Sequence, residues 1–273
     1  MSATAFAIVA AFTLAGATIY TKRLATDFPH HQLIGPLFVF NSLLVVPFAF
    51  FVHWHLGWRI YALHAASALM LIVGSYAIFD LFAHGSAAAV AVGTAMTPMP
   101  ALIFSALLLS APITGLQAAG AIVVTTGVLF ALAPAFGLLS RRRAAASVLV
   151  SATTNGVLIV LTKMLSNRGV TLPEIYTVRT AIAGVVFVAL IPPRGIPLSG
   201  YPRLAIRSSL QTAYFVLLIA AVQRGHPATV QTIVATTPLL LLAWNAVWHR
   251  RRPPLRLVAA SVAVVAGVAL AVA

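Results

Sequence analysis

Long apolar runs separated by short polar gaps divide the chain into ten segments. The runs cover about 3–21, 33–52, 61–82, 86–109, 113–133, 145–163, 174–191, 204–222, 227–248 and 257–272. About 20 apolar residues are enough for a helix to cross the hydrocarbon core of a bilayer. Such a segment must satisfy its own backbone polar groups, and these runs lack the polar–apolar alternation of barrel strands. The pattern predicts an all-α membrane protein with ten transmembrane helices.

The second half of the chain repeats features of the first about 140 positions later. The matched pairs are Gly85 with Gly225, Thr97-Pro98 with Thr237-Pro238, and Gly127 with Gly267. Each half holds five runs, and an odd number forces the second half to enter the membrane from the opposite side. We therefore expect two inverted five-helix repeats, residues 1–133 and 144–273, joined by a linker at 134–143. Secondary transporters built this way hold their solute near the bilayer midplane, between the repeats.

Composition agrees with a chain that lies in lipid. Hydrophobic residues make up 61% of it and charged residues 7%, whereas a soluble domain has roughly a quarter charged residues. The net charge of +14 comes from basic residues in the gaps between runs, where cytoplasmic loops and headgroup contacts explain it without nucleic acid. We expect a multi-pass protein of the bacterial inner membrane, with lipid and a small solute as partners and a monomer or a dimer as its state.

Basic residues also predict the orientation. Twelve of the 17 Lys and Arg residues fall in the gaps after the first, fifth, seventh and ninth runs. The positive-inside rule puts those gaps in the cytoplasm and both termini outside. The first run, Ala3 to Tyr20, lacks a preceding basic region, which favours a retained helix over a cleaved signal peptide.

Two prolines should interrupt the fourth and ninth helices, because proline lacks a backbone donor and frees a carbonyl one turn earlier. Paired broken helices in an inverted repeat are the best sequence pointer to a solute site or hinge; the alternative is a packing kink capped by a threonine hydroxyl. We place the prolines and their neighbouring threonines in the candidate solute site: Thr94, Thr97, Pro98, Thr236, Thr237 and Pro238.

Asp80 lies near the end of the third helix, with Tyr76 and His84 four residues to either side and therefore on one helix face. An ionisable group at membrane depth costs about 2.5–3.5 kcal/mol on insertion scales, so it usually faces a cavity or a partner. Asp80 and His84 are thus candidate proton-coupling residues. The alternative places both at the interface among lipid headgroups.

Arg179 lies about one turn inside the seventh helix, beside Tyr176, and Glu174 opens that helix. A carboxylate or phosphate of the solute could pair with the guanidinium. The alternatives are snorkelling to the interface or a structural pair with Glu174. Tyr76, Asn155 and Tyr214 complete the candidate solute-binding set.

Other polar residues are assigned structural roles. Asn41, Gln211, Gln231 and Asn245 are expected to form interhelical hydrogen bonds, and Lys22 and Lys163 to anchor helix ends. His30, His31, His53 and His55 have no carboxylate or cysteine partner at metal-ligand spacing. We therefore predict no metal and no cofactor.

These features resemble the drug/metabolite transporter superfamily, in its EamA-like branch. The residues behind the resemblance are Thr21-Lys22 and Thr162-Lys163, Pro98 and Pro238, Gly127 and Gly267, and Arg179 in "YTVRTAIAG". The chain departs from the family at Leu109-Ser110 and His249-Arg250, where Gly-Glu is common. It also departs at Asn41, since the first half has this asparagine where the second half has Arg179. The resemblance implies export of metabolites, amino acids or toxic compounds, import in some branches, and cytoplasmic termini, against the charge count.

The scarcity of acidic residues and of catalytic motifs narrows the range of functions that the chain can have. The chain has 3 acidic residues and no carboxylate in its first run, which disfavours an exporter of organic cations. We predict a secondary transporter, an exporter of a small neutral, zwitterionic or anionic metabolite such as an amino acid, working by alternating access around a central cavity. A lipid-linked sugar flippase and a non-transporting structural protein stay as alternatives. An intramembrane enzyme is disfavoured because nucleophile–base motifs and acidic clusters are missing.

Overall fold

The ten apolar runs form helices in the computed structural model, which describes residues 2–52, 54–55, 57–84, 87–110, 112–132, 142–193, 196–248 and 255–272. In chain order they are α1 (Ala3–Asp27), α2 (Ile34–Ala49) after the 3-10 turn η1 (His30–Leu33), α3 (Trp58–His84), α4 (Ala87–Met96) with α5 (Pro98–Leu109), α6 (Gly115–Ala131), α7 (Arg142–Ser166), α8 (Leu172–Leu190), α9 (Tyr201–Arg224) after η3 (Leu198–Gly200), α10 (Pro227–Val234) with α11 (Thr237–Trp248), and α12 (Leu255–Val272).

Eight of these segments are long and apolar enough to cross a membrane, and two shorter apolar helices, Gly115–Ala131 and Val258–Val272, complete the set. None of the described residues forms a strand. The predicted all-α membrane fold is confirmed.

The fourth and ninth segments are each broken at a proline. α4 ends at Met96 and α5 begins at Pro98, while α10 ends at Val234 and α11 begins at Thr237, one residue before Pro238. A threonine hydroxyl takes up a carbonyl that each break frees. Thr97 Oγ1 donates to the Gly93 carbonyl at 3.2 Å, and Thr237 Oγ1 donates to the Val234 carbonyl at 2.6 Å. The breaks therefore leave few backbone acceptors unsatisfied in lipid.

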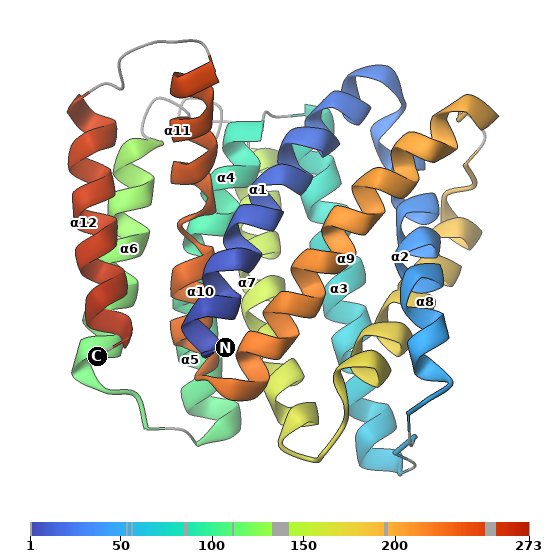
Figure 1. Cartoon of the computed structure of the whole chain (residues 1–273), viewed down its shortest axis with the longest axis horizontal. Coiled ribbons are helices and arrows are strands. Elements are labelled where there is room, and N and C mark those ends of the chain that lie inside the picture. Colours follow the sequence, from blue (N-terminus) through green and yellow to red (C-terminus); the bar gives the residue numbers. More distant parts are fainter. Residues whose placement is uncertain are drawn as a thin grey trace.

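The two halves interlock through equivalent helix pairs. α3 packs against α7 and α9 packs against α1, while α6 packs against α12 and α2 against α8. In the repeat, α1, α2, α3 and α6 correspond to α7, α8, α9 and α12. The α3–α7 contact is therefore equivalent to the α9–α1 contact, and α6–α12 and α2–α8 each pair a helix with its own counterpart. In Figure 1 the α6–α12 pair lies at one end of the row of helices and α2 with α8 at the other. The start of α1 and the end of α12 lie on the same side of the bundle, as an inverted repeat of two five-helix halves requires.

Glycines bring α6 and α12 into backbone contact. A Cβ atom built on Gly120 would lie 2.5 Å from the Gly267 carbonyl oxygen, and one on Gly127 would lie 3.5 Å from the Ala260 carbonyl oxygen. Positions 120 and 260, like 127 and 267, are separated by the repeat offset, so the two crossings are equivalent. Small residues allow this close approach of the two backbones. It matters in lipid, because an apolar side chain gains little free energy when it exchanges contact with lipid for contact with another helix. The linker predicted at 134–143 falls largely outside the described residues, and that division of the chain stays a prediction.

Candidate solute site

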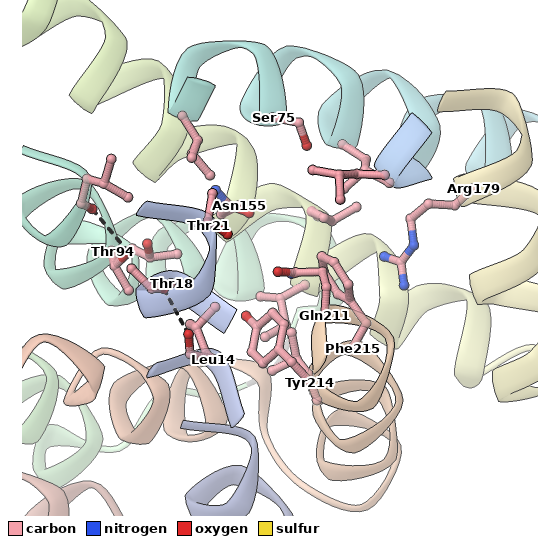
Figure 2. A pocket seen from close by; sticks show the side chains of 18 of the residues that line it. Leu14, Thr18, Thr21, Ser75, Thr94, Asn155, Arg179, Gln211, Tyr214 and Phe215 are labelled. Carbon is pink, nitrogen blue, oxygen red and sulfur yellow. Dashed lines mark hydrogen bonds between the residues drawn. The ribbon is translucent and has the colours of Figure 1, made fainter. Parts of the chain in front are cut away.

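A cavity of about 120 Å³ lies where the two halves meet. Its walls come from α1, α2, α3 and α4 of the first half and from α7, α8, α9 and α10 of the second. These are repeat-related helices, so the two halves contribute equivalent elements to the walls. Figure 2 shows polar side chains from several helices around this space, together with aromatic rings of α9.

Two arginines supply the charge of the cavity lining. Arg207 Nε donates to Thr21 Oγ1 at 2.9 Å, and Arg179 Nη1 donates to Thr162 Oγ1 at 3.1 Å. The two threonines belong to the repeated Thr-Lys pairs, so each half fixes one cavity arginine through the same residue type. Among the described residues that line the cavity, none is acidic.

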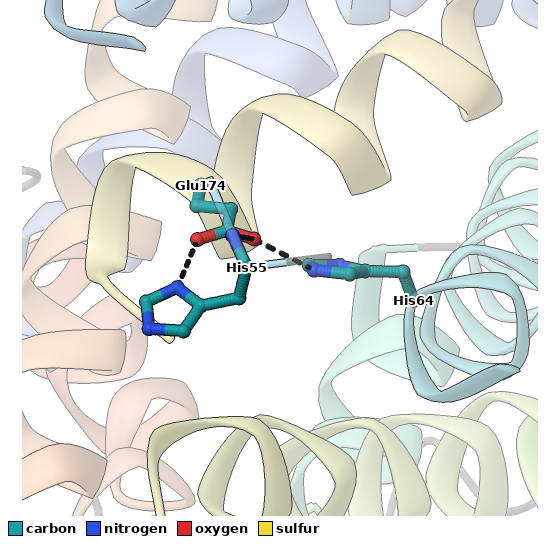
Figure 3. Close-up of polar contacts among 3 residues, drawn as sticks. All are labelled: His55, His64 and Glu174. Carbon is teal, nitrogen blue, oxygen red and sulfur yellow. Dashed lines mark hydrogen bonds and ion pairs between the residues drawn. The ribbon is translucent and has the colours of Figure 1, made fainter. Parts of the chain in front are cut away.

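The acidic side chains of the chain are paired elsewhere. Asp27 accepts a hydrogen bond from exposed Arg203 at 2.8 Å, and Asp80 pairs with Arg143 and Ser147 on α7. Glu174 lies between two histidines, with its Oε2 2.9 Å from His55 Nδ1 and its Oε1 3.7 Å from His64 Nε2, as Figure 3 shows. These contacts leave the charges of the cavity arginines unbalanced.

The sequence comparison identifies the family. The sequence profile of the EamA-like transporter family matches residues 1–133 and 142–273. The chain belongs to the EamA-like transporter family. It is therefore a transporter of the drug/metabolite type in a membrane, and the resemblance noted from its motifs is confirmed.

Comparison with solved structures shows the same fold. One of them, titled "Crystal structure of protein", is similar with a TM-score of 0.75 at 20% sequence identity, over 99% of this chain and 98% of that chain. A search of curated proteins by sequence found no match.

Five residues of the candidate solute-binding set line the cavity of this EamA-like transporter: Thr94, Thr97, Asn155, Arg179 and Tyr214. Thr94 and Thr97 belong to the break between α4 and α5, which borders the cavity. The other members of the break set, Pro98, Thr236, Thr237 and Pro238, lie outside the lining. Thr237 instead bonds the carbonyls of Val234 and Ala11, which is a packing role.

Tyr76 points away from the cavity. Its side chain is 45% exposed and its ring stacks on His31 with 5.5 Å between centroids. The cavity face of α3 instead carries Ser75, Ile78, Phe79 and Phe82. One residue along a helix turns a side chain by about 100°, so Ser75 takes the place expected for its neighbour.

Asp80, one of the two candidate proton-coupling residues, lies apart from the cavity lining. Asp80 is 3% exposed and links the end of α3 to the start of α7 through Arg143 and Ser147. The side chain of His84 lies outside the described residues.

Lys163, expected to anchor a helix end, donates from Nζ to the carbonyls of Val222 and Gln223 at 3.0 and 3.2 Å, at the last turn of α9.

The surroundings of Glu174 differ from what the sequence indicated. The alternative in which Arg179 pairs with Glu174 is not seen, and His55, which was expected to lack a carboxylate partner, binds it through both its ring and its backbone nitrogen. The contact joins positions that lie 119 residues apart. The segment before α3 returns to the start of α8, and no local spacing indicates that path.

Sequence reasoning missed several cavity residues, the clearest being Arg207. It was counted with the cytoplasmic gap after the seventh run, but α9 begins at Tyr201, so Arg207 lies inside the helix. Arg207, Gln211, Tyr214 and Leu218 follow at helical spacing, and all four line the cavity. The polar stripe i, i+4, i+7 was visible in the sequence and would have indicated this face.

Proposed function

We propose that this EamA-like transporter exports a small neutral, zwitterionic or anionic metabolite, such as an amino acid, by alternating access. The observation that carries the proposal is the cavity between the halves, which is lined by repeat-related helices and carries polar side chains among apolar ones. Hydroxyls, amides and two arginines surround it, and their side chains suit a solute with hydrogen-bonding groups. The lack of acidic residues in the described lining disfavours a cationic solute.

The broken helices support an alternating mechanism. α4 and α10 line the cavity, whereas α5 and α11 continue from the breaks beyond it. Gly156 of α7 packs closely on the start of α5, because a Cβ there would lie 2.7 Å from Pro100 Cβ. A half-helix can pivot at a proline break without losing regular helical hydrogen bonds, since the break has already removed them.

Counterflow in proteoliposomes tests the function. The purified protein would be reconstituted and loaded with amino acids, nucleobases or quaternary amines in turn, and exchange of labelled solute measured. We expect exchange of one of the first two groups and none of quaternary amines. Movement of a lipid-linked sugar alone would support the flippase, and no movement of any solute would support a structural protein. Uptake into inside-out vesicles tests the export direction.

A threonine in the cavity wall provides a matched test of the site. Thr94 lines the cavity and Thr126 is exposed on α6, and each hydroxyl donates to the carbonyl four residues earlier. Thr94→Val is expected to lower the transport efficiency about 2- to 13-fold, the effect of one hydrogen bond worth about 0.5–1.5 kcal/mol. Thr126→Val removes the same internal bond and should leave transport unchanged. Equal effects of the two substitutions would show that the hydroxyl acts only on its own helix.

Asp80→Asn tests proton coupling. A carboxylate that carries a proton must leave Arg143 and Ser147 during the cycle, and an amide cannot take part. If Asp80 couples protons, the variant should still exchange solute in counterflow but lose its response to a pH gradient. The control is Asp27→Asn, which removes an exposed carboxylate. An Asp80→Asn variant that transports like the parent at every pH would exclude Asp80 as the proton carrier.

A further inference from the structure

Arg179 is a buried cation whose donors are only partly used. Its side chain is 2% exposed, on α8, and its guanidinium carbon lies 5.8 Å from the centre of the Phe215 ring. Nη1 donates to Thr162, while Nε and Nη2 have no hydrogen-bond partner within the described part of the chain. Buried polar groups in native proteins are nearly always satisfied, so two orphan donors on one charged group need an explanation.

No acidic side chain of the protein can satisfy these donors. The sequence holds 3 acidic residues. Glu174, the acid on the same helix, is bound by the ring and the backbone of His55, and Asp27 and Asp80 are bound by Arg203 and Arg143. A buried charge without a partner is costly, and removing it from water is repaid only by a counter-charge with good geometry. The counter-charge for Arg179 must therefore come from outside the chain.

The free donors have the geometry that an oxyanion requires. Nε and Nη2 lie on one edge of the guanidinium, and two parallel N–H groups bind the two oxygens of a carboxylate or phosphate. Figure 2 shows the Arg179 guanidinium directed toward the space beside Phe215 and Gln211. Arg207 adds a second positive charge to the lining. The phenyl ring and the threonine hydroxyl hold the guanidinium in place, while the two nitrogens of this edge are buried without a hydrogen-bond partner in the described part of the chain.

We propose that Arg179 binds the anionic group of the transported solute, a carboxylate or another small oxyanion, through Nε and Nη2. The inference rests on the proposed function and narrows it, because neutral solutes would then leave the arginine unpaired. Arg179 offers a partner to the carboxylate of an amino-acid zwitterion, whereas the described lining offers its ammonium group no acidic side chain. The site therefore favours organic anions over zwitterions of the same size.

Direct binding to the purified protein tests this separately from transport. The probes are propionate, propionamide, inorganic phosphate and chloride, each titrated against detergent-solubilised protein by calorimetry and by thermal shift. We expect propionate to bind at least 10-fold more tightly than propionamide and to raise the melting temperature. Arg179→Gln should abolish this preference. Arg179→Lys keeps the charge without the paired donors and should retain only part of it.

Two controls keep the result interpretable. Arg168→Gln removes an exposed arginine, just after the end of α7, whose contact is the Met164 carbonyl in the last turn of that helix, and it should leave the preference for propionate unchanged. Arg179→Gln should melt at the same temperature as the unliganded parent or higher, because it removes an uncompensated buried charge. A large loss of stability would instead show that Arg179 serves the fold, and would overturn the proposal.

Further outcomes distinguish a resident chloride ion from an anion supplied by the solute, and failure of the oxyanion site from failure of the transport function. Chloride binding that propionate and phosphate cannot displace would identify a resident counter-ion, and would overturn the proposal that the solute supplies the anion. Equal affinity for propionate and propionamide would overturn it too. Arg179-dependent binding of propionate or phosphate without any counterflow would uphold the oxyanion site while refuting transport. Counterflow of neutral solutes that is unaffected by Arg179→Gln would uphold transport while refuting the oxyanion site.

Discussion

Gly120→Ala is expected to separate α6 from α12 and to destabilise the protein by about 1–3 kcal/mol. The added Cβ would lie 2.5 Å from the Gly267 carbonyl oxygen and 2.6 Å from the Ala271 backbone nitrogen. Both atoms belong to the backbone, so neither can move aside by changing a rotamer. The whole of α12 must shift instead, and the equivalent crossing at Gly127 and Ala260 must shift with it. Thermal unfolding in detergent, followed by tryptophan fluorescence, measures the effect.

Gly16→Ala is the matched control. Gly16 lies in the middle of α1, and a Cβ there would meet nothing within 4 Å. Alanine is the better helix former by about 1 kcal/mol, so this variant should unfold at the same or a higher temperature than the parent. If both substitutions shift unfolding in the same direction, the α6–α12 crossing is looser than its geometry indicates.

Glu174→Gln is expected to cost about 1.5–3 kcal/mol, the usual contribution of a hydrogen bond to a charged group. The carboxylate accepts from the ring and the backbone of His55 and faces His64, which is buried. An amide keeps the shape but supplies one acceptor in place of two and no charge. The segment around His55 should then detach from the start of α8. A lower unfolding temperature, with faster proteolysis near residue 55, is the expected readout.

Asp27→Asn controls for the loss of a carboxylate. The Asp27–Arg203 pair has both side chains largely in solvent, with exposed fractions of 42% and 51%. Pairs of this kind contribute about 0.2–1 kcal/mol, so the variant should unfold close to the parent. If Glu174→Gln proves as mild as Asp27→Asn, the two histidines do not depend on the carboxylate.

The fold was predictable because its causes are local. Each apolar run is long enough to form a helix across a membrane, and the missing backbone donor of Pro98 causes the break between α4 and α5. The cavity lining was predictable where an amide or a charged side chain interrupts an apolar run, as Asn155 and Arg179 do. It was not predictable where a rotation of the helix by one residue decides which side chain faces the cavity, as between Ser75 and Tyr76. Contacts such as His55 with Glu174 depend on how distant helices pack, and that information is spread over the whole chain.

The unbalanced positive lining has an electrical consequence for the transport cycle. A solute that enters the cavity as a monoanion adds one negative charge to the moving complex. In a cell with a negative interior, the resting voltage drives that charge outward, with about 2.3 kcal/mol per 100 mV for each elementary charge. Export of an organic anion would then draw on the membrane potential without a coupling ion, and uptake of the same anion would have to work against it.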